Sequence, residues 1–210
     1  MNCDRIAPYY KLLEYLSFGP SLQRTRTYFL PYLQTQQRIL LLGVGDGRFL
    51  AQLLNINPTA TIDSYDLSAG MILEAKSRIT KHQVNFYEQD ITTTHLPNQT
   101  YDAIVANFFF DCFNTNQLTT LIASLKLSAQ PDCLWFVSDF QIPIAQPAKL
   151  IAILLTRFLY LCFALTTGLK QRQLPNYHQA LTSNLLNLTH RQDSLAGILT
   201  TRLYRHNLER

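Results

Sequence analysis

Residues 39–50 read ILLLGVGDGRFL and constrain the fold more than any other segment of the chain. The four apolar residues at 39–42 predict a short strand without a polar face, as in the middle of a parallel sheet. Three alternating glycines follow, Gly43, Gly45 and Gly47, before an apolar pattern with helical spacing begins. A glycine-rich turn between a strand and a helix lets a ligand approach the backbone closely, because glycine has no Cβ.

The spacing of these glycines argues against a dinucleotide. Dinucleotide-binding turns have the pattern G-x-G-x-x-G, whose third glycine would fall at position 48, where this sequence has Arg48. The turn also carries an acid, Asp46, next to where a pyrophosphate would have to lie. Both departures suit a ligand that carries a positive charge. The pattern of hydrophobic residues followed by G-x-G-x-G resembles the first motif of class I S-adenosylmethionine (SAM)-dependent methyltransferases.

Strand-like and helix-like segments alternate along the rest of the chain. This order predicts an α/β fold with a Rossmann-like, seven-stranded, mostly parallel sheet, a C-terminal antiparallel hairpin and helices on both faces. The class I methyltransferase fold has the same layout. The predicted strands are 39–42, 61–66, 84–89, 101–107 and 133–140, followed by a hairpin of 185–191 and 197–206, and the predicted helices lie within 9–35, 47–54, 67–80, 116–128 and 148–169.

The length of 210 residues predicts one domain, 1–210, that buries a full α/β core. Within it we expect residues 1–35 to form an N-terminal helical cap and residues 141–180 an apolar helical insertion near the substrate site. The four cysteines have no paired short spacing and are interpreted as reduced thiols of a cytoplasmic protein. The N-terminus has no apolar core of a signal peptide.

Acids follow the predicted strands at the edge where ligands bind in such sheets. Asp66, with Leu67 after it, ends the second strand, where an acid can accept both hydroxyls of a ribose. An aspartate in this position can equally cap the helix that follows. The methyltransferase resemblance implies that Asp90, after the third strand, contacts an adenine amino group and that Ile91 stacks on the ring. The alternative for Asp90 is local hydrogen bonding in a turn.

The fourth strand runs into ANFFFDCF. The resemblance implies that Asn107 and Phe108 lie beneath the methionine part of SAM. Three consecutive phenylalanines cannot all face one core, so some of them face a neighbouring helix or an apolar pocket. Asp111 is interpreted either as a base or substrate anchor over the transferred methyl group, or as a carboxylate stabilised by a helix N-terminus.

Histidines offer one further catalytic candidate and no metal site. The five histidines are scattered along the sequence, without the spacing of metal ligands. His178 follows the apolar helix in the segment PNYH, which is predicted to fold over the cleft as a lid. A histidine there would serve as a general base, because its side chain titrates near neutral pH. The alternative is a solvated histidine in a loop.

The apolar segment 150–169 has about the length of a membrane span, but Arg157 near its middle would be costly in a bilayer. We therefore expect a buried or surface-lying helix. Its place after the fifth strand is where this methyltransferase family inserts substrate-recognition elements. An apolar helix there predicts a small, hydrophobic or aromatic acceptor, taken up in one interpretation at a membrane surface. The alternatives are a homodimer interface and a plain core helix.

The resemblance implies a methyltransferase that moves the methyl group of SAM to such an acceptor by in-line displacement, with S-adenosylhomocysteine (SAH) as the product. A nucleic-acid methyltransferase is the first alternative, but the net charge of +4 is spread along the chain and ANFFFDCF lacks the N-P-P-[YF] type of motif. A non-catalytic SAM-binding partner protein is the second, because a fold does not fix a function.

Overall fold

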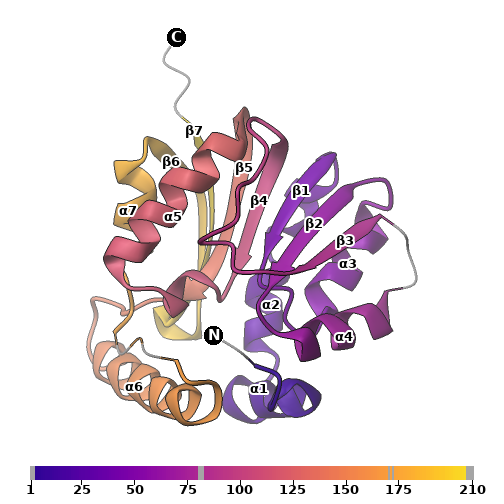
Figure 1. Ribbon diagram of the computed structural model, residues 1–210. Coiled ribbons are helices and arrows are strands. Elements are labelled where there is room, and N and C mark those ends of the chain that lie inside the picture. The colour runs from indigo at the N-terminus through magenta and orange to yellow at the C-terminus, as the bar shows by residue number, and fades with distance from the viewer. Residues whose placement is uncertain (1–2, 80–82, 170, 172, 207–210) are drawn as a thin grey trace.

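The computed structural model of the chain describes residues 3–79, 83–169, 171 and 173–206. The ends of the predicted 1–35 cap and 67–80 helix, and two positions of the 141–180 insertion, lie outside these ranges. The core is one seven-stranded sheet with the order β3-β2-β1-β4-β5-β7-β6, as predicted for the fold class (Figure 1). Neighbouring strands from β3 to β5 are parallel, whereas β7 is antiparallel to both β5 and β6. The strands are β1 (Arg38–Leu42), β2 (Thr61–Asp66), β3 (Val84–Glu88), β4 (Tyr101–Asn107), β5 (Ala129–Phe140), β6 (Leu186–Ser194) and β7 (Leu199–His206).

Helices cover both faces of this sheet, and the central strand shows why. In β1, Ile39 and Leu41 are buried against α3 and α4, whereas Leu40 and Leu42 are buried against α5 and α7. Successive side chains of a strand point to opposite faces, so an uninterrupted apolar run requires a cover on each side. The α-helices are α1 (Tyr10–Phe18), α2 (Ser21–Thr27), α3 (Arg48–Ile56), α4 (Ala69–Arg78), α5 (Thr115–Ser128), α6 (Ala148–Thr167) and α7 (Tyr177–Ser183).

The connection between β3 and β4, residues 89–100, contains no helix, and the sequence predicts none there. The structure differs from the predicted element order at α7. Helix α7 stands where the sequence predicts a lid-like loop. Asn176 caps this helix, because its side chain accepts a hydrogen bond from the Gln179 amide. The helix packs against α5 and β6, and this contact stabilises a segment too short to be helical by itself.

The three glycines of the turn after β1 all have positive φ, but different neighbours require them. A Cβ on Gly47, at φ +78°, would lie 2.6 Å from Ala75 Cα, so this glycine allows α3 to pack closely on α4. A Cβ on Gly43 would lie 2.9 Å from a ring carbon of Phe109. A Cβ on Gly45 would meet nothing within 4 Å. Packing therefore explains the first and third glycines, and the second faces open space.

We expect Gly47→Ala to lower the free energy of unfolding by about 3 kcal/mol or more, because the substitution adds a clash with the α4 backbone to the strain of a left-handed alanine. Gly168→Ala is the matched control. Gly168 has a similar φ of +71° but nothing within 4 Å of its Cβ position, so we expect a loss of only about 1 kcal/mol. Urea unfolding of both variants measures the difference. Equal losses would show that close helix packing does not require Gly47.

Candidate functional site

A cavity of about 860 Å³ lies at the carboxyl edge of the sheet, where the strand order reverses between β1 and β4. Ligands bind at this edge in open α/β sheets. Residues that follow or end all five parallel strands line the cavity, and α1 and α6 border it as well. Nine of the lining residues at the strand ends are Gly43, Gly45, Asp66, Leu67, Asp90, Ile91, Asn107, Phe108 and Phe140.

Backbone amides hold Asp66 in place at the cavity wall. Its Oδ2 accepts a hydrogen bond from the Val44 amide at 3.0 Å, and its Oδ1 accepts one from the Ser68 amide at 2.9 Å. Ser68 is the residue that caps α4, since its side chain accepts from the Met71 amide. Each carboxylate oxygen keeps a second lone pair for a ligand hydroxyl. Burial raises the pKa of Asp66, and the backbone hydrogen bonds oppose that shift.

Asp90 and Ile91 line the same cavity after β3. Asp90 Oδ1 accepts from the Thr92 amide at 2.9 Å and from the Thr92 hydroxyl at 2.7 Å, so the local turn that the sequence offers as an alternative is formed. This turn positions the carboxylate without removing it from the cavity. Ile91 is buried in the same core cluster as Tyr65, and Tyr65 also lines the cavity.

Asn107 is the residue whose side chain most clearly lacks a protein partner. It ends β4 at the cavity wall, and both polar atoms of its carboxamide are buried with no hydrogen-bond partner in the described part of the chain. Buried amides without a partner are rare, so such a group indicates a polar ligand or water. The next residue, Phe108, lines the cavity at φ +52°, a conformation that is unusual for a phenylalanine.

Two buried carboxyl groups lie at or next to this wall. Asp111 lines the cavity and its pKa is raised to about 6, because burial disfavours the charged form. Asp139, at the end of β5, is fully buried, and its Oδ2 accepts a hydrogen bond from the Asp111 amide at 3.2 Å. Burial and the neighbouring charge of Asp111 raise the pKa of Asp139 well above its usual range. The Cys112 thiol donates to Asp111 Oδ1 at 3.6 Å, so a reduced thiol contacts the acid.

Three predicted site residues lie away from the cavity lining. Asp46 is buried and its Oδ2 lies 2.6 Å from Arg48 Nε, so its charge is already neutralised and not available to a ligand. Gly47 packs on α4, as described above. His178 lies on α7, where its Nδ1 is 3.0 Å from the Tyr204 hydroxyl of β7. The predicted lid over the cleft is therefore wrong for His178, because α7 packs on α5 and β6 instead.

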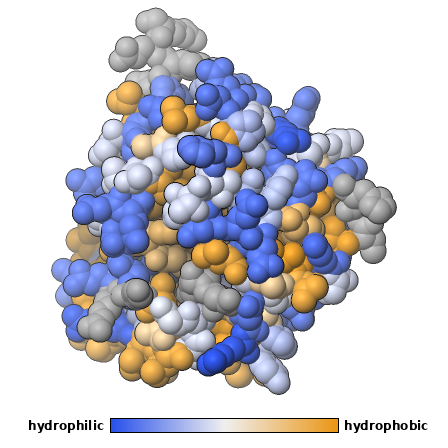
Figure 2. Space-filling model, viewed as in Figure 1, coloured by the Kyte–Doolittle hydropathy of each residue, from blue (hydrophilic) through white to orange (hydrophobic). Residues whose placement is uncertain are grey.

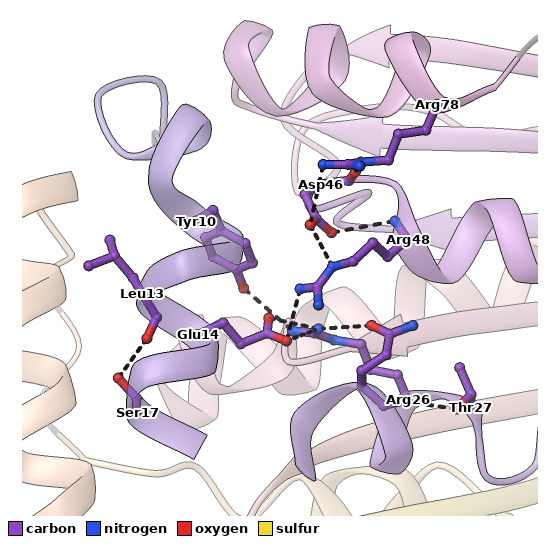
Figure 3. Close-up of polar contacts among 10 residues, drawn as sticks. Tyr10, Leu13, Glu14, Ser17, Arg26, Thr27, Asp46, Arg48 and Arg78 are labelled. Atoms are coloured by element: carbon purple, nitrogen blue, oxygen red, sulfur yellow. Dashed lines mark hydrogen bonds and ion pairs between the residues drawn. The ribbon is translucent and has the colours of Figure 1, made fainter. Parts of the chain in front are cut away.

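The structure also identifies a residue that sequence reasoning missed, Glu14 of α1, which lines the cavity and is buried. Figure 3 shows its carboxylate between two guanidinium groups. Arg26 Nη1 lies 2.8 Å from Glu14 Oε2, and Arg48 Nη2 lies 2.9 Å from Glu14 Oε1. Arg48 continues to Asp46, whose backbone carbonyl accepts from Arg78 Nε at 2.7 Å. A lone acid in a short helix gives no sequence signal for such a network.

The comparisons with known proteins agree with this geometry. A family model described as a methyltransferase domain matches residues 39–132, which include the glycine turn and the ends of β2, β3 and β4. A malonyl-[acyl-carrier protein] O-methyltransferase of Bacillus anthracis is 42% identical over 77 residues, 37% of this chain and 28% of that protein. Its counterpart in Priestia megaterium is 37% identical over 93 residues, 44% of this chain and 33% of that protein. The matches thus span about a third of the curated relatives.

Solved structures show the same fold over nearly the whole chain. The N-methyltransferase NodS from Bradyrhizobium japonicum WM9, in complex with SAH, superposes with a TM-score of 0.67 at 15% identity, covering 94% of this chain and 98% of that one. A 1,6-didemethyltoxoflavin N1-methyltransferase from Burkholderia thailandensis gives a TM-score of 0.65 at 14% identity, covering 95% and 84%. The resemblance first indicated by the glycine turn is confirmed: residues 39–132 match a methyltransferase domain, and the chain has the fold of solved SAM-dependent methyltransferases.

Proposed function

We propose that the protein transfers the methyl group of SAM to a small hydrophobic or aromatic acceptor. One observation carries the proposal: the buried carboxamide of Asn107 has no hydrogen-bond partner among the described residues and lies at the wall of a cavity with an open glycine, Gly45, on the same edge. A polar ligand at this place would satisfy both atoms of the amide. The residues of the cavity therefore fit the cofactor that the family uses.

The chain offers a separate group for each part of that cofactor. Gly45 leaves room for the amino-acid end beside Asn107 and Phe108. Asp66, oriented by two backbone amides, would accept hydrogen bonds from the ribose hydroxyls. Asp90 and Ile91 would hold the adenine, the first by a hydrogen bond and the second by apolar contact. When bound, SAM supplies an electrophilic methyl group on a positively charged sulfur.

The acceptor side of the cavity is apolar. Leu13 and Phe18 of α1 line it, together with Phe158 and Phe163 of α6. Phe108 and Phe109 add two of the three consecutive phenylalanines, while the third belongs to a buried core cluster. Such a lining favours a small aromatic or aliphatic acceptor and excludes water during the reaction.

Asp111 is the residue that we propose to hold or move the proton of the acceptor. It lines the cavity, and a carboxyl group with a pKa of about 6 is largely ionised at neutral pH yet basic enough to assist deprotonation. The Asp139 carboxyl group, which accepts from the Asp111 amide, positions the backbone of this residue. Alignment of acceptor and donor in a site closed to water supplies the rest of the rate enhancement.

The class of acceptor and the cellular location of the protein are further parts of the proposal. The named relatives methylate malonyl groups on an acyl-carrier protein, but the matches span only about a third of those proteins. We favour a free small molecule because the apolar cavity is bordered by helices on two sides. The four cysteines are free, and we place the protein in the cytoplasm for that reason. A nucleic-acid substrate suits this apolar lining poorly.

Calorimetric titration with SAM and SAH tests the cofactor assignment. We expect Asp66→Ala to weaken SAH binding about ten- to hundredfold, because two charge-assisted hydrogen bonds to the ligand are lost. Asp102→Ala is the matched control. Its carboxylate also accepts two backbone hydrogen bonds, from Gln37 and Arg38, but at the start of β1, at the opposite edge of the sheet. Absence of binding to the wild type would end the methyltransferase proposal, and equal weakening in both variants would end the assignment of Asp66.

The pH dependence of stability tests the state of Asp111. Its folded-state pKa of about 6 lies above the usual aspartate pKa of about 3.9, so the folded protein binds more protons between these values. The free energy of unfolding therefore falls as the pH rises from about 4 to about 6 and stays lowered above. Asp111→Asn removes this fall. We expect the free energy of unfolding of the variant, minus that of the wild type, to rise by about 2–3 kcal/mol between pH 4 and pH 8. Urea unfolding at each pH measures this difference.

The exposed Asp132 provides the control for this measurement, since Asp132→Asn makes the same chemical change without burial. The difference between this variant and the wild type should remain constant within about 0.5 kcal/mol over the same pH range. A constant difference for Asp111→Asn as well would contradict a titration near pH 6 and remove Asp111 as the base.

A further inference from the structure

Helix α6 exposes more apolar surface than a helix of a folded domain usually does. It is long and apolar enough to cross a membrane, yet only 17% of an 18-residue apolar stretch of the helix is buried in the domain. Its buried residues, Ala152, Thr156 and Tyr160, recur every fourth position and mark the face against the domain. The opposite face is uncovered, and Figure 2 shows hydrophobic side chains along the lower edge of the molecule, where α6 lies in Figure 1. Its most exposed large residues are Leu150, Leu154, Phe158, Leu161 and Leu165.

The exposed apolar surface continues beyond α6. Ile144, in the segment that leads into α6, is 96% exposed. Helix α1 borders the same cavity and exposes Leu12 and Leu16. We call the exposed side chains of α1, residues 141–147 and α6 the apolar face. Exposed apolar side chains gathered on neighbouring segments mark an interaction site.

The charges of the apolar face select its partner. Lys11, Lys149 and Arg157 are exposed on it, and residues 141–168 contain no acid. The acid of α1, Glu14, is buried between two arginines and presents no charge outward. A second copy of this chain would bring the same cations against them in a symmetric contact, which is unfavourable. An anionic bilayer offers both an apolar interior and negative headgroups.

We infer that the apolar face lies on an anionic lipid bilayer, with α6 parallel to the membrane plane. The exposed leucines of α6 would enter the boundary between headgroups and acyl chains, and the three cations would contact the headgroups. Arg157 is compatible with this position, because a helix lying in the interface keeps a flanking arginine at headgroup level, whereas a spanning helix would carry it through the bilayer.

The mouth of the cavity opens onto the same face. Leu13 of α1 and Phe158 of α6 both line the cavity and are 45% and 62% exposed. An apolar molecule dissolved in the bilayer would therefore reach the cavity without crossing water. The inference adds a surface to the proposed function but does not depend on it, since vesicle binding requires neither cofactor nor acceptor.

Flotation with vesicles of stated composition tests the inference. We expect the wild type to float with vesicles of phosphatidylcholine and phosphatidylglycerol at 3:1, and at least tenfold less with phosphatidylcholine alone. The double variant Lys149→Glu, Arg157→Glu should weaken binding to the anionic vesicles by tenfold or more, and Leu161→Ser with Leu165→Ser should weaken binding to both kinds. All four side chains are exposed, so these variants should unfold at the wild-type temperature.

Helix α5 supplies the matched controls. Leu127→Ser removes a leucine that is 67% exposed, and Lys126→Glu reverses a charge, both away from the apolar face. Neither should alter flotation. Absence of wild-type flotation, or an equal loss in the controls, would overturn the inference. So would a dimer in analytical ultracentrifugation that the α6 substitutions dissociate. Retention of the protein on vesicles after an alkaline carbonate wash would show a spanning helix and overturn the placement in the membrane plane.

SAH titration of the same variants separates this inference from the proposed function. A variant that no longer floats but binds SAH like the wild type has lost only the membrane contact. A wild type that floats but binds neither SAM nor SAH retains the membrane surface and contradicts the methyl transfer instead.

Discussion

The buried carboxylate of Glu14 is the interaction on which the arrangement of the site depends. It places a negative charge from α1 between Arg26 of α2 and Arg48 of α3, and Arg48 also pairs with Asp46 in the glycine turn (Figure 3). Burying one carboxylate with two guanidinium groups is costly, so such a network forms only where its geometry is good. Its consequence is positional: the N-terminal cap is attached to the turn that faces the cavity, and α1 becomes one of the cavity walls.

The same network explains why the acid of the glycine turn does not line the cavity. The glycine turn has a packing role and also faces the cavity, and its sequence pattern does not show which residue serves which role. Gly43 and Gly47 make close packing against Phe109 and Ala75 possible, and Asp46 is directed into the ion network. Only Gly45 leaves open space on the cavity side. The strained φ of Phe108, at the end of the neighbouring strand β4, is consistent with a cavity wall held in place by the surrounding core.

Properties that depend on local periodicity could be predicted from the sequence, and those that depend on tertiary contacts could not. The apolar run 39–42 indicates a strand buried on both faces, and the positions of Asp66, Asp90 and Asn107 after their strands place them at one edge. The burial and ion pairing of individual side chains could not be predicted in this way. Arg48 lies two residues after Asp46, but the sequence does not show that the two side chains pair or that Arg78 approaches them from α4. The isolated PNYH segment likewise does not show that α7 carries His178 to β7. Glu14 escaped notice for the same reason.

Helix α6 connects the chemistry of the cavity with the surface of the protein. The hydroxyl of its Tyr160 donates to the backbone carbonyl of Asp111 at 3.1 Å, so the helix is fixed directly to the segment that carries the proposed base. Asp111 has a raised pKa because it is buried, and α6 is part of what keeps water away from it. A shift of α6 toward or away from the domain would change both the width of the cavity and the hydration of this carboxyl group. The same helix therefore holds the segment of the proposed base on its inner side and forms part of the apolar face on its outer side.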